Sequence, residues 1–278
     1  MIMPSPEPLL KIVNASVVKN GTRVLDNLSL EIAPGQHTAI FGPNGSGKSS
    51  LIKLITRQHY PLAQSNGEPS VSIFGKARWD IFSLRRQLGI VSADVQQGFA
   101  ADPDLTGRDV VLSGFFAGHG LAAHHVVTSE MEAQAEAALE LAQAAFLAGK
   151  PIAWMSTGEA RRILIARALG PDPKALLLDE PTAGLDLSAR RRFLETLRGI
   201  AGAGKTILLV THHAEEIFPE IGRVILLHEG KVFRDGRTEE VLTSANLSAL
   251  FGEAVEVRCR GGVYSAEMVA PGLEIRVF

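Results

Sequence analysis

The stretch "FGPNGSGKSS" (residues 41–50) decides the fold, because it sets three glycines, a lysine and three serines between two apolar runs. It follows an apolar segment, "HTAIFG" (37–42), and leads into a helical pattern, "KSSLIKLITRQ" (48–58), with the helix expected from Ser46 onward. Consecutive backbone N–H groups can surround phosphate oxygens only where side chains leave room, and the positive end of the following helix adds favourable charge. The pattern G-x-x-x-x-G-K-[ST] in this strand–helix context therefore predicts a phosphate-binding loop.

Two residues of this loop have expected roles in holding a nucleotide. Lys48 is expected to reach the β- and γ-phosphates, and the hydroxyl of Ser49 is expected to ligate Mg²⁺. The alternative is a glycine-rich turn that caps a helix and holds no ligand. A phosphate loop alone also does not separate kinases, GTPases and motor-type ATPases. The expected nucleotide-binding residues are Gly42, Pro43, Asn44, Gly45, Ser46, Gly47, Lys48, Ser49 and Ser50.

The bulk composition is that of a globular protein with a sizeable core. Of the 278 residues, 46% are hydrophobic and 21% are charged, and the net charge is −2. This balance does not require nucleic acid as a partner, and none is expected. The single cysteine, Cys259, excludes an internal disulfide and fits a reducing compartment. The chain shows neither a secretory signal pattern nor the roughly 20 apolar residues of a membrane span, so we expect no segment that crosses a bilayer.

Short apolar runs alternate with helical patterns along the chain. Continuous apolar strands of this kind are typical of parallel sheets whose two faces are covered by helices. We therefore expect an α/β fold: a P-loop NTPase core with a mostly parallel sheet, an antiparallel β portion near the N-terminus and an inserted helical subdomain. The expected strands of the sheet are 37–42, 71–75, 88–92, 175–179, 206–211 and 223–228.

The helical subdomain is predicted at 93–170, so that one core domain is formed by two chain segments, 1–92 and 171–278. Between 128 and 146 the apolar residues recur at helical spacing, which predicts one long helix with a single apolar face. That face contains Met131, Ala135, Ala138, Leu139, Ala142, Ala145 and Phe146. The tail, 252–278, alternates weakly in "AVEVRC" (254–259) and "LEIRVF" (273–278), which favours short antiparallel strands.

Polar groups follow two of the predicted strands. The run "ALLLD" (175–179) ends in Asp179 and is followed by Glu180. At the carboxyl edge of a parallel sheet, Asp179 is expected to hold Mg²⁺ directly or through water, and Glu180 to act as general base on the attacking water. An exposed acidic turn is the alternative. His212, at the end of "ILLVTHH" (207–213), is expected to contact the γ-phosphate, and His213 to begin a helix; a surface or capping role is the alternative for each.

The segment "WMSTGEARRILIARAL" (154–169) completes the set of motifs. Ser156 and Glu159 have the spacing of a capping box at a helix N-terminus, where anions bind readily. A capped helix that holds no ligand is the alternative for this segment alone. Together with the phosphate loop, "LLLDEP", "AGLD" and "VTH", in this order, the segment resembles the ATP-binding cassette (ABC) family over residues 10–242. The resemblance implies that the signature residues Ser156, Thr157, Gly158 and Glu159 contact ATP held by a second copy of the chain. It also implies that Asp186, in "AGLD", lies at the seam between the two copies.

Three departures from the family pattern bear on function. Thr157 and Glu159 replace the usual glycine and glutamine of the signature, which would weaken contacts across the dimer. The family's glutamine after the strand "GIVS" is shifted, so the resemblance assigns the Mg²⁺-linked role to Gln96, with Gln97 as the alternative. The adenine-stacking aromatic is replaced by Val18 and Lys19. Because base–aromatic stacking contributes about 1–3 kcal/mol per base, the preference for adenine is expected to be relaxed.

By resemblance, the chain is an ATPase that uses ATP and Mg²⁺, with Lys48, Glu180 and His212 as catalytic residues. The chain would pair head to tail with a second copy, as a homodimer, or with another ABC subunit. The pair would trap two ATP molecules between its two members and separate after hydrolysis. We expect the subunit to power an integral-membrane permease from the cytoplasmic face of the cell membrane. The run "LTGRDVVLSGFF" (105–116) resembles importer subunits for metal chelates or oxyanions. The rival interpretations are a soluble ABC ATPase that acts on DNA or in translation, and an ATP-sensing regulator that does not hydrolyse ATP.

Overall fold

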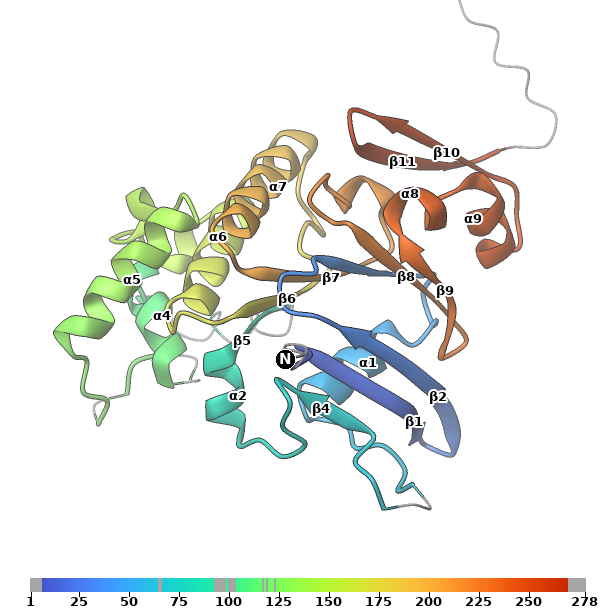
Figure 1. The fold of residues 1–278 in the computed structure, drawn as a ribbon. Coiled ribbons are helices and arrows are strands. Elements are labelled where there is room, and N and C mark those ends of the chain that lie inside the picture. Colours follow the sequence, from blue (N-terminus) through green and yellow to red (C-terminus); the bar gives the residue numbers. More distant parts are fainter. Residues whose placement is uncertain are drawn as a thin grey trace, which may run out of the picture.

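The computed structural model describes residues 7–64, 67–92, 99, 104–116, 118, 120–122 and 124–269. The described chain forms a β-rich core with helices packed on it, and a group of helices gathers on one side of that core (Figure 1). No helix among the described residues is both long enough and apolar enough to cross a lipid bilayer.

A six-stranded sheet forms the centre of the core. Its strands lie in the order β5 (Leu88–Val91), β6 (Ala175–Asp179), β7 (Thr206–Thr211), β3 (Thr38–Phe41), β8 (Arg223–His228) and β9 (Lys231–Arg237). The first five run parallel and β9 is antiparallel to β8. The strands expected at 175–179, 206–211 and 223–228 coincide with β6, β7 and β8, and those expected at 37–42 and 88–92 contain β3 and β5. The mostly parallel sheet is therefore confirmed.

Alternate residues of the parallel strands face two different cores, which explains their continuous apolar sequences. In β6, Leu176 and Leu178 pack into one cluster of buried residues, whereas Ala175 and Leu177 pack into the other. The first cluster joins the sheet to the group of helices. The second joins it to α1 (Lys48–Ile55) and to the N-terminal strands. A strand buried on both faces has no polar face, so its sequence lacks the alternation of a half-exposed strand.

A second, antiparallel sheet lies over α1 and has the strand order β2 (Thr22–Ile32), β1 (Leu10–Lys19), β4 (Val71–Ile73). The expected antiparallel portion near the N-terminus is therefore confirmed. The strand expected at 71–75 is present, but its assignment to the parallel sheet was wrong, because β4 pairs antiparallel with β1. An apolar run of three residues carries no signal that would tell which sheet it joins.

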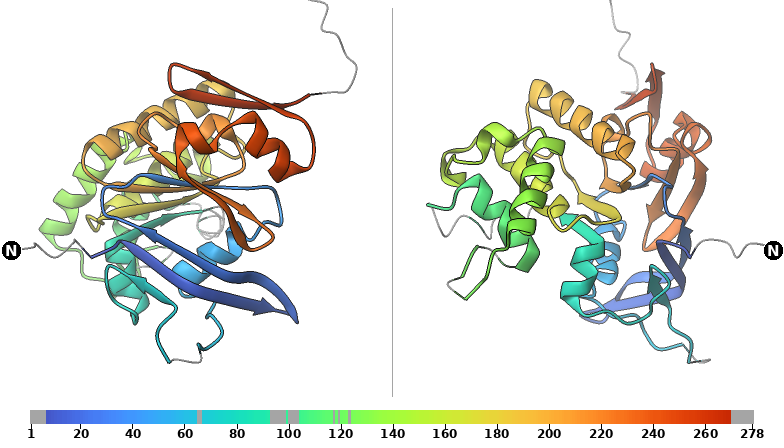
Figure 2. Two further views of the ribbon diagram at one scale, coloured as in Figure 1. Left: turned by 45° about the vertical axis from the view of Figure 1, so that its right-hand side comes forward. Right: turned by 60° about the vertical axis from the view of Figure 1, so that its left-hand side comes forward.

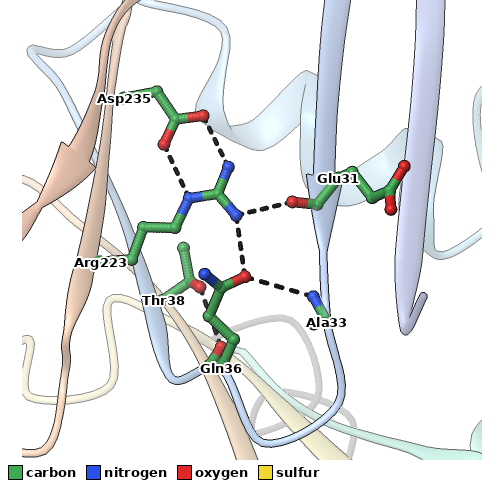
Figure 3. Close-up of polar contacts among 6 residues, drawn as sticks. All are labelled: Glu31, Ala33, Gln36, Thr38, Arg223 and Asp235. Atoms are coloured by element: carbon green, nitrogen blue, oxygen red, sulfur yellow. Dashed lines mark hydrogen bonds and ion pairs between the residues drawn. The ribbon is translucent and has the colours of Figure 1, made fainter. Parts of the chain in front are cut away.

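Arg223, the first residue of β8, ties the two sheets together (Figure 3). Its guanidinium forms a bidentate pair with Asp235 of β9, with distances of 2.7 and 2.6 Å. It also donates to the backbone oxygen of Glu31 in β2 (2.6 Å) and to Oε1 of Gln36 (2.9 Å). Such a planar fork suits several fixed acceptors at once. The contact fixes where the N-terminal sheet meets the edge of the central sheet.

The group of helices, here called the helical lobe, consists of α4 (Gly107–Ser113), α5 (Ser129–Leu141) and α6 (Thr157–Leu169). The lobe stands beside the core in two further views (Figure 2). Its chain leaves the sheet after β5 and returns before β6, and these two strands are hydrogen-bonded neighbours. Because β5 and β6 run parallel, the chain leaves at the carboxyl end of β5 and re-enters the sheet at the amino end of β6.

The helix expected over 128–146 is shorter than its apolar pattern suggested. It begins after the N-cap Thr128, as expected, but ends at Leu141. Gln143 adopts a left-handed backbone conformation with φ 53°, which cannot continue an α-helix. Ala145 and Phe146 are therefore not part of the buried face; the Phe146 side chain is 71% exposed.

The last described part of the chain covers one end of the core (Figure 1). It consists of α8 (Thr238–Val241), α9 (Ser244–Phe251) and a hairpin of β10 (Val255–Arg260) and β11 (Val263–Met268). The expected strand in "AVEVRC" is present as β10. Its antiparallel partner is β11, and the second expected strand, 273–278, lies outside the described residues. The remaining core helices are α2 (Ile81–Gln87) and α7 (Leu187–Gly202).

Candidate functional site

The candidate site is built where three neighbouring parallel strands end. In the sheet, β6, β7 and β3 are adjacent, and the residues that follow them are Glu180, His212 and Gly42. Asp179 is level with Val210, and Thr211 is level with Phe41, so all three ends lie at one height of the sheet edge. Ligands of open parallel sheets bind at this edge. The topology therefore brings together the phosphate loop, the paired carboxylates and the histidine that the sequence indicated.

The phosphate loop needs glycine at defined positions. Gly45 and Gly47 have positive φ angles of 82° and 106°, a backbone region that side chains disfavour. Gly42 leaves no room for a side chain, because a Cβ there would lie 2.4 Å from the backbone oxygen of Leu227 in β8. The loop then enters α1 at Lys48, two residues later than expected. These constraints fix the backbone of residues 42–48 in the concave shape that a phosphate group requires.

Lys48 is buried, and its ammonium group is turned back over its own loop. Nζ donates to the backbone oxygens of Gly42 (2.7 Å) and Pro43 (3.0 Å). Burial lowers the pKa of Lys48, while the negative charges of Glu180 and Asp179 partly oppose that shift. The hydroxyl of Ser46 is also buried and has no hydrogen-bond partner among the residues that the structure describes. A buried cation and an unpartnered hydroxyl in a loop that leads into a helix N-terminus suit an anionic ligand with several oxygen atoms.

Glu180 and His212 contact each other directly, although the sequence predicted separate roles for them. Nδ1 of His212 lies 2.8 Å from Oε1 of Glu180. Glu180 itself has a left-handed backbone conformation, φ 44°, and its N–H donates to the oxygen of Val210 in β7. Nε2 is left as the second polar atom of the imidazole ring. The histidine therefore holds the carboxylate in one orientation.

Ser49 and Asp179, the expected Mg²⁺ ligands, line the same cavity of about 430 Å³. A serine hydroxyl and a carboxylate are oxygen ligands of the kind Mg²⁺ prefers. The donor set therefore fits this metal. The third expected ligand, Gln96, and its alternative, Gln97, lie outside the described residues.

The signature segment forms a capped and exposed helix end. Ser156 is the N-cap of α6, and its hydroxyl accepts from the N–H of Glu159. The carboxylate of Glu159 accepts from the N–H of Ser156 (2.7 Å), so the capping box that the sequence indicated is present. The side chains of Ser156 and Thr157 are exposed, whereas Gly158 and Glu159 are half-buried.

Asp186 caps the neighbouring helix and lies near the signature of its own chain. Its carboxylate accepts from the N–H of Ala189 at the start of α7 (2.8 Å). A Cβ on Gly158 would come within 3.5 Å of Ala189 and 3.8 Å of Leu185. Among the described residues, no hydrogen bond or ion pair joins the Ser156 helix end to the phosphate loop.

Sequence reasoning missed Lys150, which contacts the signature segment. Its Nζ lies 3.0 and 2.8 Å from the two carboxylate oxygens of Glu159. It also missed Glu216, whose fully buried carboxylate accepts from the hydroxyl of Thr182, two residues after Glu180. The acid-rich sequence "HHAEEI" gave no sign that one of its two glutamates is buried. The separation of nine residues between Lys150 and Glu159 matches no helical or strand spacing, so no pattern connects them.

Comparisons with known proteins point to one family. The family model described as ABC transporter matches residues 25–183. The chain is 37% identical over 254 residues to the uncharacterized ABC transporter ATP-binding protein YlmA of Bacillus subtilis, with 90% of this chain and 93% of that protein covered. It is 37% identical to the Nod factor export ATP-binding protein I of Burkholderia thailandensis (80% and 68% covered). It is 34% identical to the cobalt import ATP-binding protein CbiO of Rhodobacter capsulatus (80% and 76% covered).

Solved structures show the same fold. A chain of an inward-facing transporter described as an ABC transporter of the metal-chelate type superimposes with a TM-score of 0.75 at 26% identity, covering 94% of this chain and 97% of that one. The ATP-binding cassette MJ0796, solved as a dimer bound to ADP and phosphate, superimposes with a TM-score of 0.64 at 28% identity (82% and 98% covered). The family match spans more than half of the chain and includes the phosphate loop and both carboxylates at the end of β6. The chain therefore belongs to the ABC transporter family, as an ATP-binding subunit with ATPase activity.

Proposed function

We propose that the chain binds ATP and Mg²⁺, dimerises around the nucleotide and powers a membrane transporter. The observation that carries this proposal is the 2.8 Å contact between Glu180 and His212 at the sheet edge beside the phosphate loop. A carboxylate held in a fixed orientation there suits a general base for the water that attacks the γ-phosphate. A non-hydrolysing nucleotide sensor has no need of such a group.

Each candidate site residue of one chain would have its own role in binding the nucleotide and Mg²⁺. The loop N–H groups and Lys48 bind the phosphates, and Nε2 of His212 reaches towards the γ-phosphate while Nδ1 orients Glu180. Ser49 and Asp179, with Gln96 as a further candidate, would hold Mg²⁺, which neutralises charge on the β- and γ-phosphates. The cavity that Ser49 and Asp179 share supports this assignment.

A second copy would close the site. Among the described residues, the exposed Ser156 helix end makes no hydrogen bond or ion pair with the phosphate loop of its own chain, so it is available to a second copy. In a head-to-tail pair, Ser156, Thr157, Gly158 and Glu159 of each copy cover the nucleotide of the other, and Asp186 lies at the seam. A two-fold symmetric dimer satisfies both sites at once. The dimeric cassette among the solved relatives supports this arrangement.

The same cavity extends away from the nucleotide between the core and the helical lobe. Ile81, Leu84 and Arg85 of α2 line it on the core side, and Arg167 and Ala168 of α6 line it on the lobe side. Its mixed apolar and basic lining suits a short helix of a permease on the inner face of the cell membrane. Movement between lobe and core on ATP binding would then reach the permease directly.

The cargo we propose is a metal chelate or an oxyanion, taken up rather than exported. The metal-chelate type transporter and the cobalt import subunit support this class. The Nod factor export subunit, at similar identity, supports the opposite direction. Uptake assays in cells that lack the chain, with radiolabelled metal chelates and oxyanions, would decide between them.

The test of the ATPase mechanism is Glu180→Gln. This change keeps the hydrogen bond to His212 and removes the base, so the hydrolysis rate should fall at least about 100-fold while ATP affinity stays within a few-fold. The variant should accumulate as a dimer with MgATP, measured by light scattering. A matched control is Glu195→Gln on α7, which removes an exposed surface pair with Arg191 and should hydrolyse ATP normally. Hydrolysis by Glu180→Gln at the rate of the control would remove Glu180 from its role.

The second candidate is a soluble ABC ATPase or ATP-sensing regulator that is not coupled to transport. The observation that favours it is the altered signature, together with the exposed Val18 where an adenine-stacking aromatic is expected. Steady-state ATPase measurements separate a regulator from an enzyme. Co-purification with a permease from detergent-solubilised membranes separates a transporter subunit from a soluble ATPase.

A further inference from the structure

Glu159 places a negative charge at the end of a helix where an anion is expected to bind. Its carboxylate accepts three hydrogen bonds: two from Nζ of Lys150, at 3.0 and 2.8 Å, and one from the backbone N–H of Ser156, at 2.7 Å. The hydrogen bond from Lys150 is the largest cause of a lowered pKa for Glu159, and that from Ser156 is the next. The carboxylate is therefore ionised at neutral pH.

An ionised carboxylate at this place opposes the binding of a triphosphate. It lies one hydrogen bond from Ser156, so an anion on the Ser156 hydroxyl or on the first N–H groups of α6 would be a close neighbour. The helix dipole contributes only about half a positive charge there, which one carboxylate cancels. The side chains of Lys150 and Glu159 are 36% and 27% exposed, so their charges are only partly screened by water.

We propose that Lys150 is a charge-compensating and positioning residue, which neutralises Glu159 and so allows the Ser156 helix end to close over the triphosphate of a second copy. This inference rests on the head-to-tail dimer of the proposed function and adds a residue to it. Lys150 stands on the chain segment before α6, outside the signature itself. It also holds the Glu159 carboxylate in the capping box, where it accepts from the N–H of Ser156 rather than pointing across the seam.

The proposal predicts an electrostatic defect that can be reversed. In Lys150→Met the Glu159 charge is uncompensated, and the ATP concentration needed for dimerisation should rise about tenfold or more, because each symmetric dimer contains this unfavourable contact twice. The defect should shrink from about 50 to about 300 mM NaCl, since salt screens partly exposed charges. Adding Glu159→Gln should remove it, because glutamine keeps the capping box without the charge.

The experiment uses the full chain in the Glu180→Gln background, so that MgATP is bound but not turned over. Dimer formation is measured by light scattering during an ATP titration for the parent, Lys150→Met, Glu159→Gln and the double variant, at both salt concentrations. The matched control is Arg108→Met, which also removes one positive charge from the helical lobe and breaks a surface pair with Glu136. We expect the control to match the parent and the double variant to match Glu159→Gln within about twofold.

Three results would overturn the inference while leaving the dimer intact. The first is a Lys150→Met defect that persists in the double variant, which would show that Lys150 acts through a different contact. The second is a Lys150→Met titration that equals the parent, and the third is a defect unchanged by salt. If the parent itself does not dimerise with MgATP, the proposed function fails instead, so the two failures are distinguishable. Circular dichroism melting of each variant shows whether the fold is retained.

Discussion

Replacing Gly42 by alanine adds a single methyl group at the most crowded point of the phosphate loop. The new Cβ would lie 2.4 Å from the backbone oxygen of Leu227 and 2.7 Å from Oγ of Ser46. The serine hydroxyl can rotate away. The Leu227 carbonyl cannot, because it belongs to β8, which is paired on one side with β3 and on the other with β9. Either the strands separate locally or the phosphate loop moves outward.

The first response would lower the stability of the fold, and the second would lower the affinity for ATP. Forcing a methyl group into a well-packed site typically costs about 1–3 kcal/mol, and a contact that is about 1 Å too short with a backbone atom belongs near the upper end. For a chain of this size that loss lowers the melting temperature by roughly 4–10 °C. If the loop moves instead, its N–H groups no longer converge, and ATP affinity should fall about tenfold or more. Circular dichroism melting and titration with a fluorescent ATP analogue measure the two quantities.

The matched control is Gly199→Ala, the same substitution at an open position. Gly199 is an exposed residue of α7, and a Cβ there meets nothing within 4 Å. Because alanine is the better helix former, this variant should be more stable than the parent by about 0.5–1 kcal/mol, with unchanged ATP affinity. A Gly42→Ala protein that melts and binds ATP like the parent would refute the close packing of the loop against β8.

Two further predictions concern the core. Burial lowers the pKa of His37, against a partial opposing effect of Glu220, and Nδ1 of His37 accepts from the N–H of Ile207 at 3.1 Å. The folded state resists protonation of His37, so the stability that the neutral imidazole contributes is complete above pH 6.5 and is lost as the pH falls below it. His37→Asn keeps a hydrogen-bond acceptor but does not titrate, so the free energy of unfolding in urea should fall less steeply between pH 6.5 and about 5. An unchanged slope would contradict this origin. Arg223→Met removes the guanidinium that donates to Asp235 and to the backbone oxygen of Glu31. The free energy of unfolding in urea should therefore fall by roughly 2–3 kcal/mol. A loss below about 0.5 kcal/mol would mean that the network behaves as an ordinary surface pair.

The central strands could be predicted from the sequence because each is an uninterrupted apolar run bounded by turn residues. β6, β7 and β8 begin and end where the sequence indicated. Both faces of these strands are buried, so the inner residues of each strand are apolar, and the apolar run stops close to where the strand stops. β4 shows the limit of this reasoning: an apolar run specifies a strand but not the strand it pairs with. The end of α5 was misplaced because apolar spacing continued past Gln143, whose left-handed backbone ends the helix.

The separate motifs of the site could be recognised from sequence, but not the contacts between them. That Glu180 and His212 lie at one sheet edge follows from strand order. No local sequence signal indicates their direct 2.8 Å contact or the left-handed backbone of Glu180. The Lys150–Glu159 pair was likewise invisible, because it joins a loop to a helix end through tertiary packing.

The position of β3 in the sheet has a consequence for how the protein is made. β3 ends at Phe41, yet both of its neighbours, β7 and β8, begin only at Thr206 and Arg223. At a synthesis rate of about 5–20 residues per second, this apolar strand waits roughly 8–30 s with both edges unpaired. During that interval the nascent chain exposes the apolar strand that leads into the predicted phosphate loop. We therefore expect the yield of folded protein to depend on chaperones that shield this segment until β7 has emerged.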